Sequence, residues 1–412
     1  MAGFIQKGVK NILQKNPQDV VFLSAIRTPI TRAKKGGLRD AYDHEMLAAV
    51  LKATTTKFPE LDPSKIDDIC VGTVLSKLGG QKAGRMAANH IGVPTTTSFS
   101  TVNRACASGL SAITNIANSI AVGQIDVGIA GGMESMTRNY QSRAIPTQLW
   151  DALKDSPVKD AKDCIMNMGI TAENVAERYG VSRSDQDAFA AQSQTRAAKA
   201  QASGFFDKEI VPVTTRWIEP EVPENVKEIT VTKDDGIRAN TTVEKLSTMK
   251  LAFKPDGTGT AGNSSQVSDG ASAALMMRRS TAAELGLTSQ IMGKWAGTQV
   301  VGCAPDEMGV GPAVAIPKLL DYTGISTSDV AVWEINEAFA SQALYCIRKL
   351  GLENATVNPN GGAIALGHPL GATSGRMLST LLHELERQEQ PLGVLSKCIG
   401  TGMGMASLVV RE

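Results

Sequence analysis

Apolar and polar residues follow two alternating patterns along the chain. A continuous apolar run at 20–26 predicts a buried strand, and segments 66–74, 98–102 and 125–130 predict three more strands. Between the first two, residues 45–58 carry apolar side chains at the spacing of one helix face. Strands that alternate with helices indicate an α/β fold.

The same order of elements occurs twice. The segment SKIDDICV at 64–71 resembles SDVAVWEI at 328–335, and IAGGM at 129–133 resembles IGTGM at 399–403. Each half is predicted to run strand, helix, strand, turn, helix, strand. This weak internal duplication predicts two similar α/β units packed together.

The middle of the chain has a different character. Residues 137–251 are rich in charged side chains and contain several helical stretches. We interpret them as an inserted, mainly helical loop domain. The N-terminal half is then 1–136, completed by about 252–285, and the C-terminal half is 286–412. Within the resumed core, 262–270 is predicted to be a loop that opens a helix of small residues.

A cysteine occupies the turn after the strand at 98–102. The segment NRACASGL at 103–110 is followed by apolar residues at helical spacing up to Gly123, which places Cys106 near a helix N-terminus. The unpaired N–H groups and the dipole at such an end favour an anion. Cys106 is therefore a candidate nucleophile, although core filling is the commoner role of a lone cysteine.

A histidine occupies the corresponding turn of the second half. The stretch NPNGGAIALGHPLGA at 358–372 places His368 among glycines, which allow close approach of backbone to backbone. We expect His368 at a strand-to-helix turn, with Pro369 in the first helical position. If the halves are related by an approximate two-fold axis, the two turns face each other, and His368 becomes a candidate base for Cys106.

Two further stretches supply polar groups at strand ends. In KCIGTGMG at 397–404, Cys398 precedes a glycine-rich turn whose N–H groups could bind an oxyanion. In NEAFA at 336–340, Asn336 offers an amide, although it could simply cap the next helix. Four polar positions at strand ends of a repeated frame favour a catalytic site.

Composition narrows the class of function. The net charge is +1, which gives no electrostatic basis for binding nucleic acid, and no apolar run is long enough to span a membrane. The six cysteines include no C-x-x-C pair, so a zinc site or a disulfide scaffold is not predicted.

At these motifs the sequence resembles the thiolases, most closely the peroxisomal 3-ketoacyl-CoA thiolases. The likeness extends from about Asp19 to the C-terminus and rests on the segments VNRACASGL, NEAFA, GHPLG and CIGTGMG. The resemblance implies a duplicated five-layer αβαβα core with an inserted loop domain. It also implies thiolytic cleavage of 3-ketoacyl-CoA to acetyl-CoA and a shortened acyl-CoA through an acyl-cysteine.

The resemblance also implies roles for individual residues. Cys106 matches the acylated nucleophile, His368 the residue that activates it, and Cys398 the second acid/base. Asn336 matches a residue that holds a water in the thioester oxyanion site, and the N–H groups of Cys106 and Gly400 match a second oxyanion hole. The implied acyl-CoA contacts are Ser265, Arg238 and Met168. The implied partners are acyl-CoA and CoA, with CoA as a substrate, no metal or other cofactor, and a homodimer or homotetramer.

Two positions depart from the family pattern. Thr401 stands where many relatives have glycine, and we expect the turn to tolerate it. Asn167 replaces a histidine of short-chain biosynthetic thiolases, which favours the degradative reaction.

Other interpretations stay open on the sequence. The alternative activity is an acetoacetyl-CoA thiolase that acts in the condensing direction. More distant alternatives are a decarboxylating condensing enzyme, which would need a second histidine motif, and a catalytically silent CoA-binding protein. The resemblance favours the peroxisome, whereas the basic, amphipathic residues 1–18 leave the mitochondrial matrix open, and the C-terminal sequence VVRE is not a peroxisomal address of the Ser-Lys-Leu type.

Overall fold

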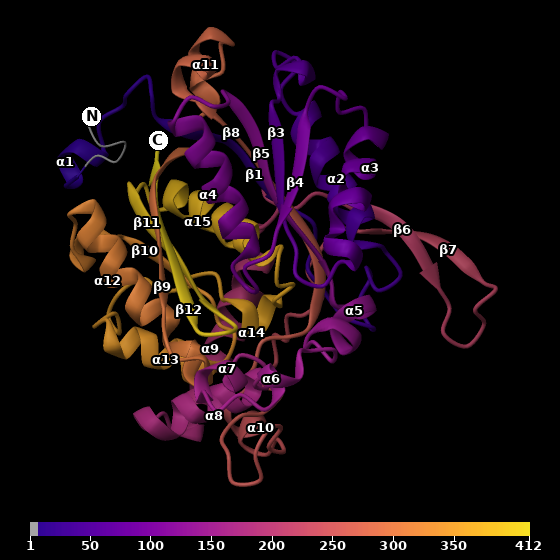
Figure 1. Cartoon of the computed structure of the whole chain (residues 1–412), viewed down its shortest axis with the longest axis vertical. Coiled ribbons are helices and arrows are strands. Elements are labelled where there is room, and N and C mark those ends of the chain that lie inside the picture. Colours follow the sequence, from indigo (N-terminus) through magenta and orange to yellow (C-terminus); the bar gives the residue numbers. More distant parts are fainter. Residues whose placement is uncertain (1–6) are drawn as a thin grey trace.

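The computed structural model describes residues 7–412, and its main element is one mixed sheet (Figure 1). The strand order is β10-β11-β12-β9-β1-β8-β5-β3-β4, with the short β2 paired to β8. The strands are β1 Val20–Arg27, β2 Thr31–Arg32, β3 Asp68–Gly72, β4 Ser98–Val102, β5 Val127–Ser135, β8 Ser268–Arg278, β9 Gly293–Gly302, β10 Val332–Ile335, β11 Leu392–Ile399 and β12 Met403–Arg411. The strands predicted at 20–26, 66–74, 98–102 and 125–130 are thus present.

The sheet order displays the predicted duplication. Outward from the short contact between β1 and β9, one side runs β8, β5, β3 and β4, and the other runs β12, β11 and β10. In each half the strand pairs at the outer edge of the sheet are parallel, and the pairs nearer its centre are antiparallel. A single parallel bridge from Trp333 to Val357 stands where β3 pairs with β4 in the first half. The two halves therefore share one topology.

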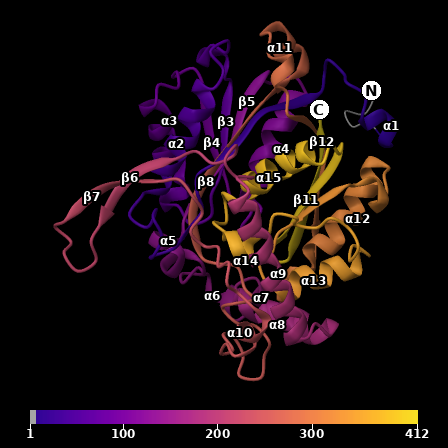
Figure 2. The same ribbon diagram turned by 180° about the vertical axis from the view of Figure 1, so that it is seen from behind.

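Helices form three layers around the two halves of the sheet (Figures 1 and 2). Helices α4 and α15 lie between the halves, because their apolar side chains share one buried cluster with β1, β8, β11 and β12. Helices α2 and α3 cover the outer face of the first half, and α12 and α13 cover that of the second. Their bounds are α2 Asp43–Thr56, α3 Gln81–His90, α4 Ser108–Ala121, α12 Gly311–Thr323, α13 Ala340–Lys349 and α15 Thr373–Arg387. The sequence of layers is αβαβα, as the resemblance implied.

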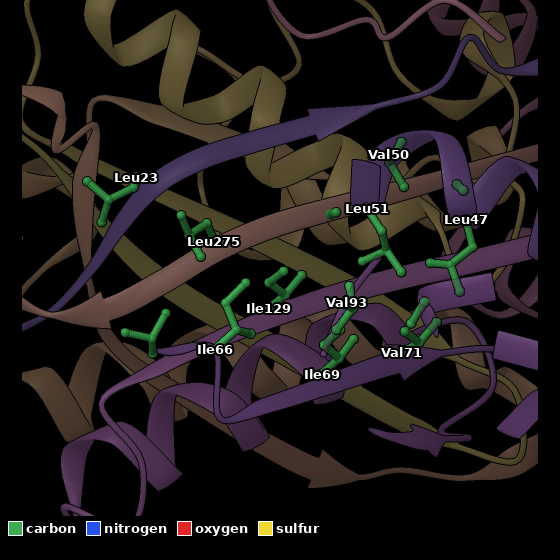
Figure 3. Close-up of a cluster of buried hydrophobic side chains, with 14 of the residues drawn as sticks. Leu23, Leu47, Val50, Leu51, Ile66, Ile69, Val71, Val93, Ile129 and Leu275 are labelled. Atoms are coloured by element: carbon green, nitrogen blue, oxygen red, sulfur yellow. The ribbon is translucent and has the colours of Figure 1, made fainter. Parts of the chain in front are cut away.

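The outer layer of the first half shows how the sequence pattern builds a layer (Figure 3). Leu47, Val50 and Leu51 of α2 pack on Leu23 of β1 and Leu275 of β8, and all five are fully buried or nearly so. Burial of each such side chain contributes about 1.5–3 kcal/mol relative to exposure. The helical spacing in 45–58 thus corresponds to one buried face of α2.

Residues between β5 and β8 leave the core and form the predicted helical region. Its helices are α5 Met136–Arg143, α6 Asp151–Lys154, α7 Lys159–Asp163, α8 Met168–Tyr179, α9 Arg183–Ala202 and α10 Val243–Ser247. The sequence did not predict the hairpin of β6 (Val213–Ile218) and β7 (Val226–Val231), which projects from the body in both views (Figures 1 and 2). The proposed domain boundaries stay predictions.

One sequence prediction for the core is wrong. The small residues after 262–270 form strand β8, and the predicted helix is absent from these described residues. The strand is buried along nearly its whole length, and helix α15 approaches it so closely that a Cβ on Gly375 would lie 2.1 Å from Ser272 Oγ. The close approach of α15 requires small side chains on β8. A run of small residues is also common in helices, which is why composition alone misassigned this segment.

Short elements complete the described chain. They are α1 Val9–Ile12, α11 Arg279–Glu284 and α14 Ala363–Leu366, with 3₁₀ turns at 63–65, 77–80, 288–290, 305–310 and 327–329. The predicted helical spacing in residues 1–18 falls partly outside the described residues. Among residues 7–412, none of the helices combines the length and apolarity needed to cross a bilayer.

Candidate active site

The two predicted turns meet at the centre of the molecule through glycine. A Cβ on Gly109, beside Cys106, or on Gly132 of β5 would lie 2.4 Å or 2.1 Å from the carbonyl oxygen of Gly371. A Cβ on Gly371 would itself lie 2.4 Å from the carbonyl oxygen of Gly72. Backbone therefore packs on backbone between the halves, as the glycines around His368 predicted.

The Cys106 turn is held in a strained shape by local hydrogen bonds. Ala105 has φ +42°, a left-handed conformation that is unfavourable for a residue with a Cβ. Its N–H donates to Asn103 Oδ1 at 2.9 Å, and Ser108 Oγ donates to its carbonyl oxygen at 2.7 Å. Helix α4 begins at Ser108 after the cap residue Ala107, so Cys106 lies just before the helix. These bonds fix the direction of the Cys106 side chain.

Burial changes the predicted ionisation of Cys106. The side chain is 9 % exposed, and this burial raises the pKa of the thiol above its ordinary value. The charge of Lys397 and the N–H groups of Gly400 and of Cys106 itself lower the pKa, but only in part. Burial thus outweighs the favourable influence predicted for the helix end, and the thiol needs the predicted base to react.

His368 is placed differently from the prediction. It follows the short helix α14, and α15 begins only at Thr373, so Pro369 is not in the first helical position. The Pro369 carbonyl accepts hydrogen bonds from Ala372 and Thr373, which makes it the start of a turn that leads into α15.

The imidazole has one bonded and one free nitrogen. His368 Nδ1 lies 2.7 Å from Thr373 Oγ1, whereas Nε2 is buried with no protein partner. Burial lowers the pKa of His368 well below its ordinary value, and the charges of Lys397 and Arg376 act in the same direction. The ring is therefore neutral near pH 7 and can accept a proton or share one through Nε2.

Cys398 lies in an apolar environment. It is fully buried in β11 among Met308 and Ala338, with Met168 and Phe339 at the edge of this cluster. Burial raises the pKa of its thiol well above the ordinary value, and the nearby Cys106 raises it further. Cys398 therefore keeps its proton in the free protein, where it can act as a proton donor.

Asn336 is the fourth predicted polar group and has no structural role as a helix cap. Its amide nitrogen and oxygen are both buried without a protein partner, at the end of β10. The next residue is fully engaged: the Glu337 carboxylate accepts hydrogen bonds from Ser193 Oγ and Asn358 Nδ2 at 2.7 and 2.8 Å. Glu337 thus ties the loop before His368 to β10, while Asn336 stays available to a ligand.

The turn after Cys398 closes the site. A Cβ on Gly400 would contact Met168 Sδ at 3.5 Å and Ala105 Cβ at 3.9 Å, so Gly400 lies between the inserted region and the Cys106 turn. Thr401 has φ +76°, so the turn accommodates it only in a strained left-handed conformation.

The other two predicted ligand contacts lie in different surroundings. The Ser265 N–H donates to the Ala338 carbonyl at 2.9 Å, two residues beyond Asn336. Arg238 is exposed and, with Lys245 and Met249, lines a cleft of about 370 Å³. Its role in binding remains a prediction.

Comparisons with known proteins identify the family. Residues 20–280 match the model of the thiolase N-terminal domain, and 289–411 match that of the thiolase C-terminal domain. The chain belongs to the thiolase family. It is 48 % identical over 406 residues to the peroxisomal 3-ketoacyl-CoA thiolase of Yarrowia lipolytica, covering 98 % of this chain and 96 % of that protein. The human peroxisomal 3-ketoacyl-CoA thiolase is 50 % identical over 396 residues, which cover 96 % of this chain and 91 % of the human protein.

Solved structures agree. The dimeric peroxisomal thiolase of Saccharomyces cerevisiae superposes with a TM-score of 0.90 at 44 % identity, covering 98 % of this thiolase and 100 % of the yeast chain. The acetyl-CoA acetyltransferase of Bacillus anthracis superposes with a TM-score of 0.84 at 35 % identity, covering 96 % of this thiolase and 99 % of the bacterial chain.

Sequence reasoning missed two buried charged residues of this thiolase. Glu134 accepts hydrogen bonds from the backbone N–H groups of Val74, Leu75 and Gly371 at 2.9–3.0 Å, and so joins the two halves. Lys397 precedes Cys398 and is fully buried. The signal for each was the one charged residue in a buried strand. All six cysteines are free, and residues 7–412 hold no group of acidic, histidine or cysteine side chains arranged for a metal.

Proposed function

We propose that this thiolase cleaves 3-ketoacyl-CoA with CoA, giving acetyl-CoA and an acyl-CoA shortened by two carbons, in peroxisomal fatty-acid β-oxidation. The observation that carries the proposal is the arrangement of two buried thiols. The Gly400 N–H and the buried Lys397 act on Cys106, and Cys398 lies nearby in an apolar cluster. Such a pair can divide nucleophilic attack and proton transfer between two residues.

In the first half-reaction, Cys106 attacks the 3-keto carbon. His368 Nε2 takes the thiol proton, and the N–H groups of Cys106 and Gly400 stabilise the negative charge that forms on the keto oxygen. The bond between C2 and C3 then breaks, which leaves the acyl group on Cys106 and releases acetyl-CoA as its enolate.

The enolate needs hydrogen bonds and a proton. Its thioester oxygen is held by His368 and by a water bound to the Asn336 amide, the two groups with unpaired buried polar atoms. Cys398 gives a proton to the carbanion, and acetyl-CoA leaves. Ionisation of Cys398 is less unfavourable at this point, because the acylated Cys106 carries no charge to repel it.

The second half-reaction reverses these proton transfers. Cys398 takes the thiol proton of an incoming CoA, whose thiolate attacks the carbonyl carbon of the acyl-Cys106. The shortened acyl-CoA leaves, and Cys106 recovers its proton from His368. Because both halves use one nucleophile, the kinetics are ping-pong.

Binding uses the inserted region together with the loop before β8. Ser265 and Met168 contact the arm and reacting end of CoA, and Arg238 with Lys245 supplies positive charge for its phosphates. No metal or other cofactor is needed for this chemistry. The assembly is a homodimer, by analogy with the dimeric yeast thiolase, with a homotetramer as the alternative.

The direct test is to mix the protein with CoA and acetoacetyl-CoA and to measure acetyl-CoA. A profile of thiolysis rates with chain length then separates the degradative enzyme from a short-chain condensing thiolase. Activity confined to acetoacetyl-CoA would favour the alternative, and no acetyl-CoA would contradict the proposal. Fusion of residues 1–25 to a fluorescent reporter tests the location, since mitochondrial import would contradict the peroxisome.

A further inference from the structure

The mechanism above leaves Lys397 without a role. Its side chain is fully buried in β11, and Nζ makes no hydrogen bond to any protein group. Among the described residues 7–412 it is the one lysine with such a buried, unpaired nitrogen. An isolated buried ammonium group is costly, so a position of this kind calls for a negative charge that compensates it.

The strand determines where the ammonium group points. Side chains alternate along β11, so Lys397 points away from Cys398 and to the same face as Leu395 and Ile399. Those two residues pack on the central layer formed by α4 and α15. Lys397 therefore extends into the layer that carries Cys106 at one helix end.

The ionisable groups around Nζ come from three elements. Cys106 and Cys398 favour its charged form, whereas Arg376 of α15 disfavours it. Arg376 is itself paired with Glu334 of β10 at 3.0 Å, and Glu134 of β5 acts on Cys106 from the other half. At His368, burial is the main cause of the lowered pKa, and the charge of Lys397 acts in the same direction.

Burial lowers the pKa of Lys397 to about 7, and the nearby Cys106 opposes this shift. The lysine therefore gains or loses its charge readily near neutral pH. Because Nζ has no hydrogen-bond partner, it acts on the Cys106 sulfur through its charge and not by direct contact.

We infer that Lys397 is the counter-charge of the Cys106 thiolate: its ammonium group stabilises the ionised sulfur while that sulfur attacks the 3-keto carbon of the substrate. The inference rests on the proposed role of Cys106 as nucleophile. It also explains which thiol ionises first, because Lys397 is the leading group that opposes burial at Cys106, whereas at Cys398 the two neighbouring thiols outweigh it. Lys397 is a positioning residue, since it acts through Cys106.

The test is the rate at which iodoacetamide alkylates Cys106 in the free protein, followed residue by residue by peptide mass spectrometry. In Lys397→Met, which keeps the length and loses the charge, alkylation of Cys106 at pH 7 should slow by about tenfold or more, since a nearby opposite charge shifts a pKa by about 1–3 units. The difference in Cys106 alkylation rate between wild type and Lys397→Met should become smaller towards pH 10, where the wild-type lysine is also neutral. Lys397→Arg should recover much of the rate.

The matched control is Lys294→Met. Lys294 is also buried on a strand, but its Nζ is bonded to the Gln14 carbonyl at 2.6 Å and to Asp19 at 3.2 Å, away from the site. This variant should alkylate Cys106 at the wild-type rate. Equal Cys106 rates at pH 7 in wild type and Lys397→Met would overturn the inference.

A second measurement uses only the wild-type protein and so tests the inference even if the Lys397 variants do not fold. With [ε-¹³C]lysine, the Lys397 signal should titrate near neutral pH and move to a lower pH after Cys106 is alkylated, because the compensating charge is lost. An unchanged midpoint would overturn the inference. Neither readout needs thiolysis, so an inactive wild-type protein would contradict the proposed function and leave this test intact.

Discussion

Cys106 and Cys398 are two buried thiols of one site, yet their surroundings differ in kind. Cys106 lies in a strained turn, with the Gly400 N–H and Lys397 acting on its sulfur. Cys398 lies inside a strand, among methionine, alanine and phenylalanine side chains. Burial raises the pKa of both thiols; at Cys106 the next largest influences, Lys397 and two N–H groups, lower it, whereas at Cys398 two neighbouring thiols raise it further.

The difference teaches how one side-chain type can perform two roles. A thiol near donors and a cation can become an anion and attack, whereas a thiol in an apolar cluster holds its proton until a carbanion takes it. Neither role requires a different residue, since the environment separates them.

The largest expected effect comes from removal of the nucleophile. Cys106→Ala should reduce thiolysis of acetoacetyl-CoA by roughly four or more orders of magnitude, the scale seen when a nucleophile is lost. Cys70→Ala is the matched control, because Cys70 is also buried and lies on β3, and it should keep activity within about twofold. Substantial turnover by Cys106→Ala would show that Cys106 is not the nucleophile and that the two thiols do not divide the roles in this way.

Loss of the second thiol should be less severe. Cys398→Ser should lower turnover by roughly two or more orders of magnitude, the scale of a lost general acid/base. Acyl transfer from a reactive thioester to Cys106 should survive far better. Exchange of the acetyl-CoA α-protons with deuterated water reports the proton transfer directly. If the variant keeps wild-type exchange and thiolysis, Cys398 is not the proton carrier.

The neutral state of His368 gives a pH prediction. Its pKa lies well below the ordinary value, so its ring signals should not titrate between pH 6 and 8 in NMR spectra of the protein's 4 histidines, with His368→Asn for assignment. In the unfolded chain the same ring binds a proton below about pH 6.5. Because the unfolded chain gains this proton and the folded protein does not, the free energy of unfolding should fall progressively as pH drops below about 6.5. A His368 midpoint near 6.5 would contradict this account.

The smallest effect concerns the turn after Cys398. Thr401 is exposed and has φ +76°, a conformation that glycine adopts without strain. Thr401→Gly should raise the free energy of unfolding by about 1 kcal/mol, the strain relieved less the extra entropy of the unfolded chain. Thr401→Ala should gain less. Urea denaturation measures both, and a destabilised glycine variant would show that the turn is not strained.

Much of the fold could be predicted from the sequence because both halves repeat one pattern. The apolar run of β1 and the helical spacing of α2 and α4 follow directly from side-chain periodicity. Strand β8 was missed because its small residues reflect the close approach of α15, a tertiary contact that has no local signal. The hairpin of β6 and β7 was missed because β7 is mostly exposed and neither strand has a continuous apolar run.

The site residues could be proposed from the sequence, but their ionisation could not. The motifs single out Cys106, His368 and Cys398 by their order along the chain, although His368 follows helix α14 and Cys398 lies within β11. Their pKa shifts depend on burial and on Lys397, which comes close to Cys106 and His368 only in the folded protein.

The most direct measurement is the position of the acyl group. The protein is incubated with a 3-ketoacyl-CoA or with acetyl-CoA, quenched in acid and digested, and the added mass is located among the six cysteines by mass spectrometry. The account predicts an acyl group on Cys106 and none on Cys398, with the same result in Cys398→Ser. An acyl group on Cys398, with Cys106 unmodified, would contradict it.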